Sequence, residues 1–315
     1  MVKNRRALDG APRYREQAMF KGSLTALITP FKAGKIDDAA FERLIERQIE
    51  EGTHGLVPVG TTGECPTLNH EEHKHVVEVC VEVARKRVPV IGGAGSNATS
   101  EAIDFTRYAQ KVGADAVLHV TGYYNKPTQE GVYQHFKAIN DAVDMPIFIY
   151  NVPSRTIVDI SVATLARCVK IKNVIGIKDA TANVARVTLQ RLACGSDFIQ
   201  LSGDDATVLG FMAHGGAGCI SVTSNIAPRL CAEFQNACRD GDWIGARRLH
   251  ERLMPLHDAL FCESNPGPVK YAAAKLGLCS GDVRLPLVAI AEESKRKVDA
   301  ALQAVGLAGL AEAAE

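Results

Sequence analysis

The chain of 315 residues has no excess of either charge, because its 36 lysine and arginine residues balance its 36 aspartate and glutamate residues. A surface without net charge gives no electrostatic reason to bind nucleic acid or an anionic membrane. No apolar run is long enough to span a bilayer, and no charged-then-apolar signal segment opens the chain. We therefore expect neither a nucleic-acid-binding protein nor a membrane protein.

The nine cysteines form no C-x-x-C pair, and their number is odd. Scattered cysteines of this kind are typical of reduced cytoplasmic thiols and not of a disulfide framework or a zinc site. No G-x-G-x-x-G fingerprint follows the first apolar run, which weakens the case for an open dinucleotide-binding sheet. These absences favour a cytoplasmic protein with free thiols.

From Gly22 onward the chain repeats one unit, in which a short apolar strand is followed by a loop and an amphipathic helix. The expected strands are Leu24–Thr29, Gly55–Val59, Pro89–Ile91, Ala116–Val120, Pro146–Tyr150, Val174–Lys178, Phe198–Ser202 and Gly218–Ser221. Helical patterns between them include Ala39–Glu51, His70–Lys86, Thr99–Val112, Glu130–Val143 and Ser161–Val169. Eight strands alternating with helices predict an α/β fold, a parallel (β/α)8 TIM barrel. An open doubly wound sheet is the alternative.

After Ser221 the pattern is helical only. The expected helices are Ala227–Arg239, Asp242–Leu260, Pro266–Leu276 and Leu285–Val305. We expect residues 19–241 to form the barrel and residues 242–315 to form an appended C-terminal helical segment. Residues 1–18 lack periodicity and are expected to be a disordered N-terminal extension.

Polar residues follow several of the expected strands, at the ends where a parallel barrel carries its chemistry. Lys178 ends the run V-I-G-I-K-D, where a partly desolvated amine can attack a carbonyl carbon. Tyr150 ends the preceding strand and can move protons. Thr61 and Thr62 lie in a G-T-T-G loop that offers N–H groups and hydroxyls to a carboxylate, and Arg155 offers a bidentate fork to a second one. Each residue alone suits a structural loop, but their joint placement predicts a lysine-based active site.

Five motifs occur in a fixed order: G-T-T-G-E, Y-N-V-P-S-R-T, G-I-K-D, S-G-D-D and E-S-N-P-G-P-V-K. Together they resemble the dihydrodipicolinate synthase family of Schiff-base lyases, which also contains N-acetylneuraminate lyase and 2-keto-3-deoxy sugar-acid aldolases. The resemblance covers the chain from Met19 to about Leu287. Arg155 and the doubled threonine favour the synthase branch.

The resemblance implies a mechanism for this branch. Lys178 forms an imine with pyruvate, whose carboxylate is held at Thr61 and Thr62. Tyr150 is the proton shuttle, linked through the Thr61 hydroxyl to Tyr124 of a neighbouring subunit. The implied assembly is a homotetramer built as a dimer of dimers, and no metal or organic cofactor is implied.

The second substrate implied by the resemblance is L-aspartate 4-semialdehyde, whose carboxylate meets Arg155. Gly203 and Ile220 line the pocket. The product, 4-hydroxy-tetrahydrodipicolinate, lies on the route to diaminopimelate and lysine. The resemblance also implies a feedback site for lysine, at positions with the right residue types. They are His70, His73, Asn97, Glu101 and Tyr123.

Three departures from the family pattern concern loops: Gly122 stands where proline is common, Cys65-Pro66 where Ser-Ala is typical, and Ile157 where a glycine is expected. They leave the chemistry intact and bear on loop rigidity and regulation.

Three other functions remain open. The nearest is an aldolase of the same family acting on a sugar acid. A metal-dependent hydrolase using His70 and His73 is disfavoured because H-E-E-H does not match H-E-x-x-H, and Asn69 with Glu72 predicts a helix capping box instead. A barrel that only binds lysine or pyruvate is disfavoured by the intact Lys178 and Tyr150.

Overall fold

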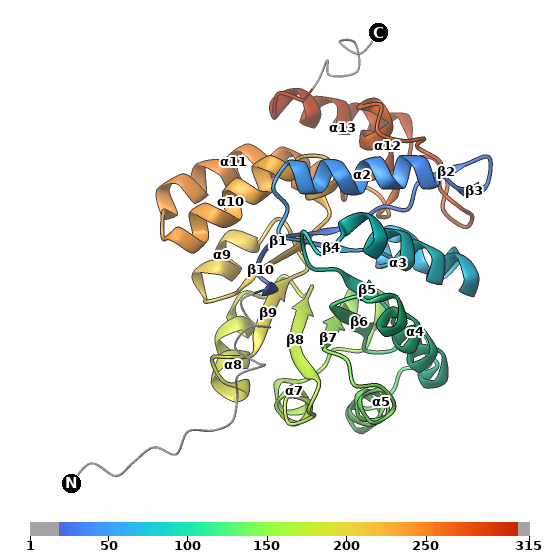
Figure 1. The fold of residues 1–315 in the computed structure, drawn as a ribbon. Coiled ribbons are helices and arrows are strands. Elements are labelled where there is room, and N and C mark those ends of the chain that lie inside the picture. Colours follow the sequence, from blue (N-terminus) through green and yellow to red (C-terminus); the bar gives the residue numbers. More distant parts are fainter. Residues whose placement is uncertain (1–18, 308–315) are drawn as a thin grey trace.

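A ring of eight parallel strands forms the centre of the computed structural model, which describes residues 19–307 (Figure 1). In ring order the strands are β4 (Gly55–Val57), β1 (Gly22–Ala26), β10 (Gly218–Ser221), β9 (Ile199–Ser202), β8 (Val174–Asp179), β7 (Ile147–Asn151), β6 (Ala116–Val120) and β5 (Ile91–Gly93). A parallel bridge from Leu56 to Val90 joins β4 to the chain before β5 and brings the ring close to closure. The predicted (β/α)8 barrel is confirmed. The expected extension at residues 1–18 lies outside the described residues.

Helices surround the ring on its outer side (Figure 1). They are α2 (Asp38–Glu50), α3 (His70–Ala84), α4 (Thr99–Val112), α5 (Gln129–Ala142), α7 (Val162–Cys168), α8 (Ala185–Cys194), α9 (Val208–Ala213) and α10 (Pro228–Asp240). Short helical turns follow three strands: η1 (Thr61–Gly63) and η2 (Cys65–Thr67) after β4, α6 (Pro153–Thr156) after β7, and η3 (Thr223–Asn225) after β10. The capping box predicted at Asn69 and Glu72 begins α3.

Three apolar clusters hold these layers together. One fills the inside of the ring and includes Leu24, Phe148, Tyr150 and Ile220. A second packs the sheet against α2 to α5 and α7, and a third joins β10 to the helices that follow it. The strands therefore bury both faces, as the apolar runs of the sequence indicate for a parallel sheet.

The C-terminal part continues with α11 (Trp243–Ala259), α12 (Gly267–Lys275) and α13 (Glu292–Ala304). Figure 1 shows α12 and α13 on the side of the barrel where α2 and the hairpin β2 (Phe31–Lys32) and β3 (Lys35–Ile36) lie. The helix predicted from Leu285 begins only at Glu292; Leu285 and Pro286 form a turn, and the chain stays non-helical up to Ala291. No helix in the described part of the chain is long and apolar enough to cross a membrane.

The first strand also ends earlier than the apolar run Leu24–Thr29 predicts, because a side chain takes the next backbone groups. The Asn225 Nδ2 donates to the carbonyl oxygens of Ala26 at 2.8 Å and Val222 at 2.9 Å, and its Oδ1 accepts from the Ile28 N–H at 3.1 Å. All of these groups are buried. Asn225 therefore satisfies backbone groups at and just after the end of β1 and just after β10, which are neighbours in the ring.

Replacing Asn225 with alanine should lower the free energy of unfolding by about 2–4 kcal/mol, because the Ala26 carbonyl and the Ile28 N–H lose their buried partners. Urea unfolding measures the change. Gln303→Ala, at an exposed position on α13, is the control and should stay within about 0.5 kcal/mol of the parent. Equal effects of the two substitutions would contradict this role of Asn225.

Candidate active site

Lys178 and Tyr150 face each other inside the mouth of the barrel. They occupy opposed positions of the neighbouring strands β8 and β7, so the pleat directs both side chains to the same face. The Lys178 side chain is only 6% exposed, and its Nζ lies 4.3 Å from the centroid of the Tyr150 ring. Among the described residues, no hydrogen bond or ion pair holds this nitrogen. A buried amine without a carboxylate partner is arranged to meet a ligand.

The next residue, Asp179, points to the outer face of the sheet and is neutralised there. Its carboxylate accepts from Arg186 Nε at 3.1 Å and Gln190 Nε2 at 2.7 Å, and from the Thr181 hydroxyl at 2.6 Å. These contacts tie the end of β8 to α8. They fix the strand end that carries Lys178 without placing a negative charge against its amine.

Gly203 lies against the Lys178 side chain. A Cβ atom on Gly203 would lie 3.0 Å from Lys178 Cε and 2.8 Å from Ala180 Cβ, so glycine leaves the lysine side chain its present space. Ile220 belongs to the apolar cluster inside the ring, together with Tyr150. The structure thus brings Gly203 to the lysine and Ile220 to the interior of the ring.

The turn after β4 carries Thr61 and Thr62 in the short helix η1. The Thr29 hydroxyl donates to the Gly63 carbonyl oxygen at 2.8 Å, and the Thr62 hydroxyl oxygen accepts from Asn265 Nδ2 at 2.9 Å. Thr61 lines the cavity described next, whereas Thr62 is buried behind it.

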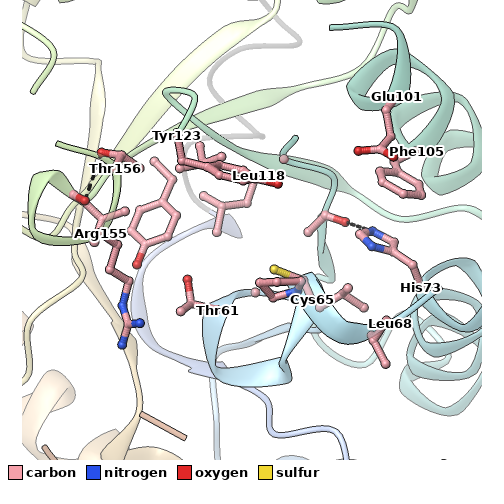
Figure 2. A pocket seen from close by; sticks show the side chains of 18 of the residues that line it. Thr61, Cys65, Leu68, His73, Glu101, Phe105, Leu118, Tyr123, Arg155 and Thr156 are labelled. Atoms are coloured by element: carbon pink, nitrogen blue, oxygen red, sulfur yellow. Dashed lines mark hydrogen bonds between the residues drawn. The ribbon is translucent and has the colours of Figure 1, made fainter. Parts of the chain in front are cut away.

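A cavity of about 450 Å³ opens at the carboxyl ends of the strands. Figure 2 shows Arg155 and Thr61 on one side of it, His73, Glu101 and Phe105 on the other, and Cys65 between them. Of the predicted site residues, those that border this cavity are Thr61, Tyr150, Arg155, His70, His73, Glu101 and Tyr123. Lys178 does not line it and lies beside Tyr150, which does. Further residues that line the cavity include Gly60, Pro66 and Val152.

Arg155 and Cys65 both line this cavity. Within residues 19–307, no carboxylate pairs with the Arg155 guanidinium, so its donors are available to a ligand. Burial raises the pKa of the Cys65 thiol to about 12, against the opposing influence of Arg155. The thiol is protonated at neutral pH and is a poor nucleophile.

Tyr124 is the one predicted catalytic residue that this chain does not bring to the mouth. Its side chain is 94% exposed, and its φ of 68° lies in the left-handed region. The adjacent Tyr123 lines the cavity instead, and Asn97 Nδ2 donates to the Tyr123 carbonyl oxygen at 3.3 Å without lining the cavity itself.

The two predicted histidines of α3 point to different partners. His70 Nε2 lies 2.5 Å from Glu101 Oε1, and His73 Nε2 donates to the Gly93 carbonyl oxygen at 2.8 Å. The His73 ring stacks on Phe105 with the centroids 3.8 Å apart. Glu72 pairs with Arg284 on another side of the helix. No group of three metal-ligating side chains occurs in the described part of the chain, which disfavours the metal-dependent hydrolase.

Comparison with known proteins decides the family. A model of the dihydrodipicolinate synthetase family matches residues 19–305. The chain belongs to this family. It is 64% identical over 289 residues to the 4-hydroxy-tetrahydrodipicolinate synthase of Parvibaculum lavamentivorans, an alignment that covers 92% of this chain and 99% of the relative.

Two solved structures of the family are informative about ligands. The dihydrodipicolinate synthase of Acinetobacter baumannii, complexed with pyruvate, is 46% identical, with a TM-score of 0.89 over 91% of this chain and 99% of that one. The enzyme of Cyanidioschyzon merolae, with lysine bound, is 36% identical, with a TM-score of 0.89 over 92% of this chain and 99% of that one. The resemblance inferred from the motifs is confirmed.

Two departures from the family pattern have a visible backbone consequence. Gly122 has a φ of 91°, which proline cannot adopt, so the loop leading to Tyr123 and Tyr124 takes a path closed to the usual residue. Ile157 has a φ of 63° directly after the segment that carries Arg155. A β-branched residue is strained in this region, where the usual glycine is not.

Sequence reasoning missed a charged group behind the threonines. Glu64, Asn265 and Lys270 belong to motifs that carry the family resemblance, yet none of them was given a role. The available signal is Lys270 itself, a charged residue within the apolar start of a helix, V-K-Y-A-A-A. Lys270 is fully buried, which requires a partner.

The stability of the protein should fall between pH 6.5 and pH 4, in part because of His73. Burial lowers the pKa of this histidine from 6.5 to about 4, so the unfolded chain binds a proton in this range that the folded chain rejects. When the pH is lowered from 7 to 5, the free energy of unfolding should fall in both proteins. The fall should be about 2 kcal/mol smaller in His73→Gln than in the parent. Urea unfolding at both pH values measures this difference, and identical losses would refute it.

Proposed function

We propose that this protein condenses pyruvate with L-aspartate 4-semialdehyde to give 4-hydroxy-tetrahydrodipicolinate through a Schiff base on Lys178. The observation that carries the proposal is the buried amine of Lys178, which lies against Tyr150 at a strand end and has no partner among the described residues. Relatives that are 58–64% identical over about nine-tenths of this chain bear the name of the synthase, which supports the same reaction here.

In the first half of the reaction, Lys178 Nζ attacks the keto carbon of pyruvate, and the carbinolamine loses water to form an imine. Tyr150, beside the lysine on the neighbouring strand, supplies and removes the protons that these steps require. The pyruvate carboxylate binds at Thr61 and Thr62, where the N-terminal N–H groups of η1 and the hydroxyls provide donors.

In the second half, loss of a methyl proton converts the imine into an enamine, whose carbon attacks the aldehyde of the semialdehyde. Arg155 binds the carboxylate of this second substrate, because its guanidinium borders the cavity and has no carboxylate partner in the described part of the chain. The substrate amine then displaces Lys178 and closes the ring. One water molecule leaves in total.

The same geometry separates the synthase from the sugar-acid aldolases of the family. A polyhydroxy aldehyde offers no carboxylate to Arg155, so the guanidinium would remain unpaired in an aldolase. Gly203 and Ile220 complete the wall around the imine in either case.

Tyr124 acts in our proposal on the mouth of a second copy of the chain, within a homotetramer made of two dimers. Its 94% exposed side chain and its position next to the cavity residue Tyr123 support this assignment. An exposed aromatic ring on a strained loop is suited to insertion into a partner.

Free lysine binds in our proposal at the end of the cavity that His70, His73, Glu101 and Tyr123 border, with Asn97 behind them. Glu101 offers a carboxylate to an ammonium group. His73 is neutral at pH 7 because burial lowers its pKa, and its Nε2 is engaged with Gly93, so its Nδ1 is an acceptor. A lysine-bound structure in the family supports the choice of ligand.

The reaction is tested by comparing initial rates with pyruvate plus L-aspartate 4-semialdehyde and with pyruvate plus N-acetylmannosamine. We expect turnover of the semialdehyde alone; turnover of the sugar alone would assign the aldolase branch. Lys178→Ala should abolish trapping of pyruvate by borohydride, whereas Lys172→Ala, at an exposed ion pair with Asp144, should retain it. Trapping that persists in Lys178→Ala would place the imine on another lysine.

Lysine at millimolar concentration should lower the initial rate. Glu101→Gln should raise the lysine concentration for half inhibition at least tenfold, relative to its own uninhibited rate, because the ammonium loses a charged acceptor. Glu71→Gln, on the exposed side of α3, should leave that concentration unchanged. A parent enzyme insensitive to lysine, or equal behaviour of the two variants, would refute the regulatory site.

A further inference from the structure

The turn that carries Thr61 and Thr62 is held from behind by the C-terminal part of the chain. We call residues 60–67 the threonine turn. Hydrogen bonds between this turn and the C-terminal part join residues that are 203 and 220 positions apart in the sequence. None of these contacts belongs to the cavity, so they act on the site only through the turn.

The central contact is a buried ion pair between Glu64 of the turn and Lys270 of α12. Both side chains are inaccessible to solvent, at 1% and 0% exposed. The second oxygen of the Glu64 carboxylate accepts from the Arg284 N–H at 3.0 Å, and Lys270 Nζ also donates to the Asp282 carbonyl oxygen at 2.7 Å. Burial lowers the pKa of Lys270, and the Glu64 carboxylate opposes that shift.

Arg284 holds the far end of the same turn. Its guanidinium donates to the Thr67 carbonyl oxygen at 3.0 Å and to both oxygens of Glu72 at 2.6 and 2.7 Å. Both cations also lie against the Phe31 ring: the Arg284 guanidinium is 4.3 Å and Lys270 Nζ is 4.0 Å from the ring centroid. The turn is thus fixed at its end and at its middle.

A third contact reaches a substrate-binding residue directly. Asn265, at the start of the segment that leads into α12, donates through Nδ2 to the Thr62 hydroxyl oxygen at 2.9 Å. A hydroxyl that accepts one hydrogen bond from a fixed amide has its own proton directed elsewhere. The side chain of Thr62 is thereby oriented by a residue of the C-terminal part.

We propose that Glu64, Lys270 and Asn265 are positioning residues for the pyruvate carboxylate, which set the place of the threonine turn and the direction of the Thr62 hydroxyl. The inference rests on the proposed function, since it takes pyruvate as the ligand of this turn. None of the three residues lines the cavity. They act by holding the turn that does.

The energetics of a buried ion pair favour a role in positioning the turn over a role in stabilising the fold. Desolvating two charges costs several kcal/mol for each ion, and a well-packed apolar pair holds a fold equally well or better. An ion pair whose carboxylate uses both oxygens fixes direction, which apolar packing does not. Glu64 needs this support because its backbone is left-handed, with a φ of 56°.

The experiment compares kcat/KM for pyruvate with kcat/KM for the semialdehyde in Glu64→Gln and Asn265→Ala. We expect kcat/KM for pyruvate to fall about tenfold and that for the semialdehyde to stay within twofold, because Arg155 is carried by α6 and none of the hydrogen bonds and ion pairs described above reaches α6. The pyruvate concentration for half-maximal borohydride trapping should rise by the same factor. A loss of folded enzyme alone would lower both values in proportion.

Tyr271→Phe is the matched control. This residue follows Lys270 on α12, and its hydroxyl donates to Asp299 and does not touch the turn, so both kcat/KM values should remain those of the parent. If Glu64→Gln does not fold, the double variant Glu64→Gln, Lys270→Met removes both buried charges, and Asn265→Ala tests the turn without altering a charge.

Two failures are distinguishable. A parent enzyme that neither traps pyruvate nor turns over the semialdehyde overturns the proposed function itself. An active parent whose folded Asn265→Ala and Glu64 variants keep the ratio of the two kcat/KM values within twofold overturns the positioning role alone.

Discussion

All strands of the ring run in one direction, so their carboxyl ends meet at a single mouth. This constraint brings side chains from distant motifs to that mouth: Thr61 after β4 and Tyr150 on β7 line its cavity, and Lys178 on β8 lies beside Tyr150. It also requires the ring to be completed, and β1 joins the two sides by pairing with β4 and with β10. Asn225 satisfies the backbone at that junction, so the shape of the mouth depends on a residue far from the chemistry.

Two buried lysines illustrate how surroundings assign a role to the same side chain. Lys270 is enclosed by a carboxylate, a carbonyl oxygen and an aromatic ring, all supplied by the protein. Lys178 has the ring of Tyr150 beside it and no such acceptors among the described residues, while Asp179 is held on the other face of the sheet. The first lysine is satisfied in the free protein, and the second is arranged to be satisfied by a substrate.

The alternation of strands and helices was sufficient to predict the barrel and to place Lys178 and Tyr150 at its mouth, because strand ends are set by local sequence. The pattern failed where a residue far away in the sequence determines the local structure. It could not show that Asn225 ends β1 early, or that Lys270 meets Glu64, since the contact lies between the two ends of the chain. It could equally not show that the Tyr124 side chain is 94% exposed.

The long reach of Arg284 has a consequence for protein synthesis. The ribosome releases the threonine turn early, but the groups that fix it emerge more than two hundred residues later. A nascent chain can therefore assemble most of the barrel while its substrate turn is still loosely held. The site therefore gains its final geometry only after Arg284 has been synthesised, long after the turn itself has left the ribosome.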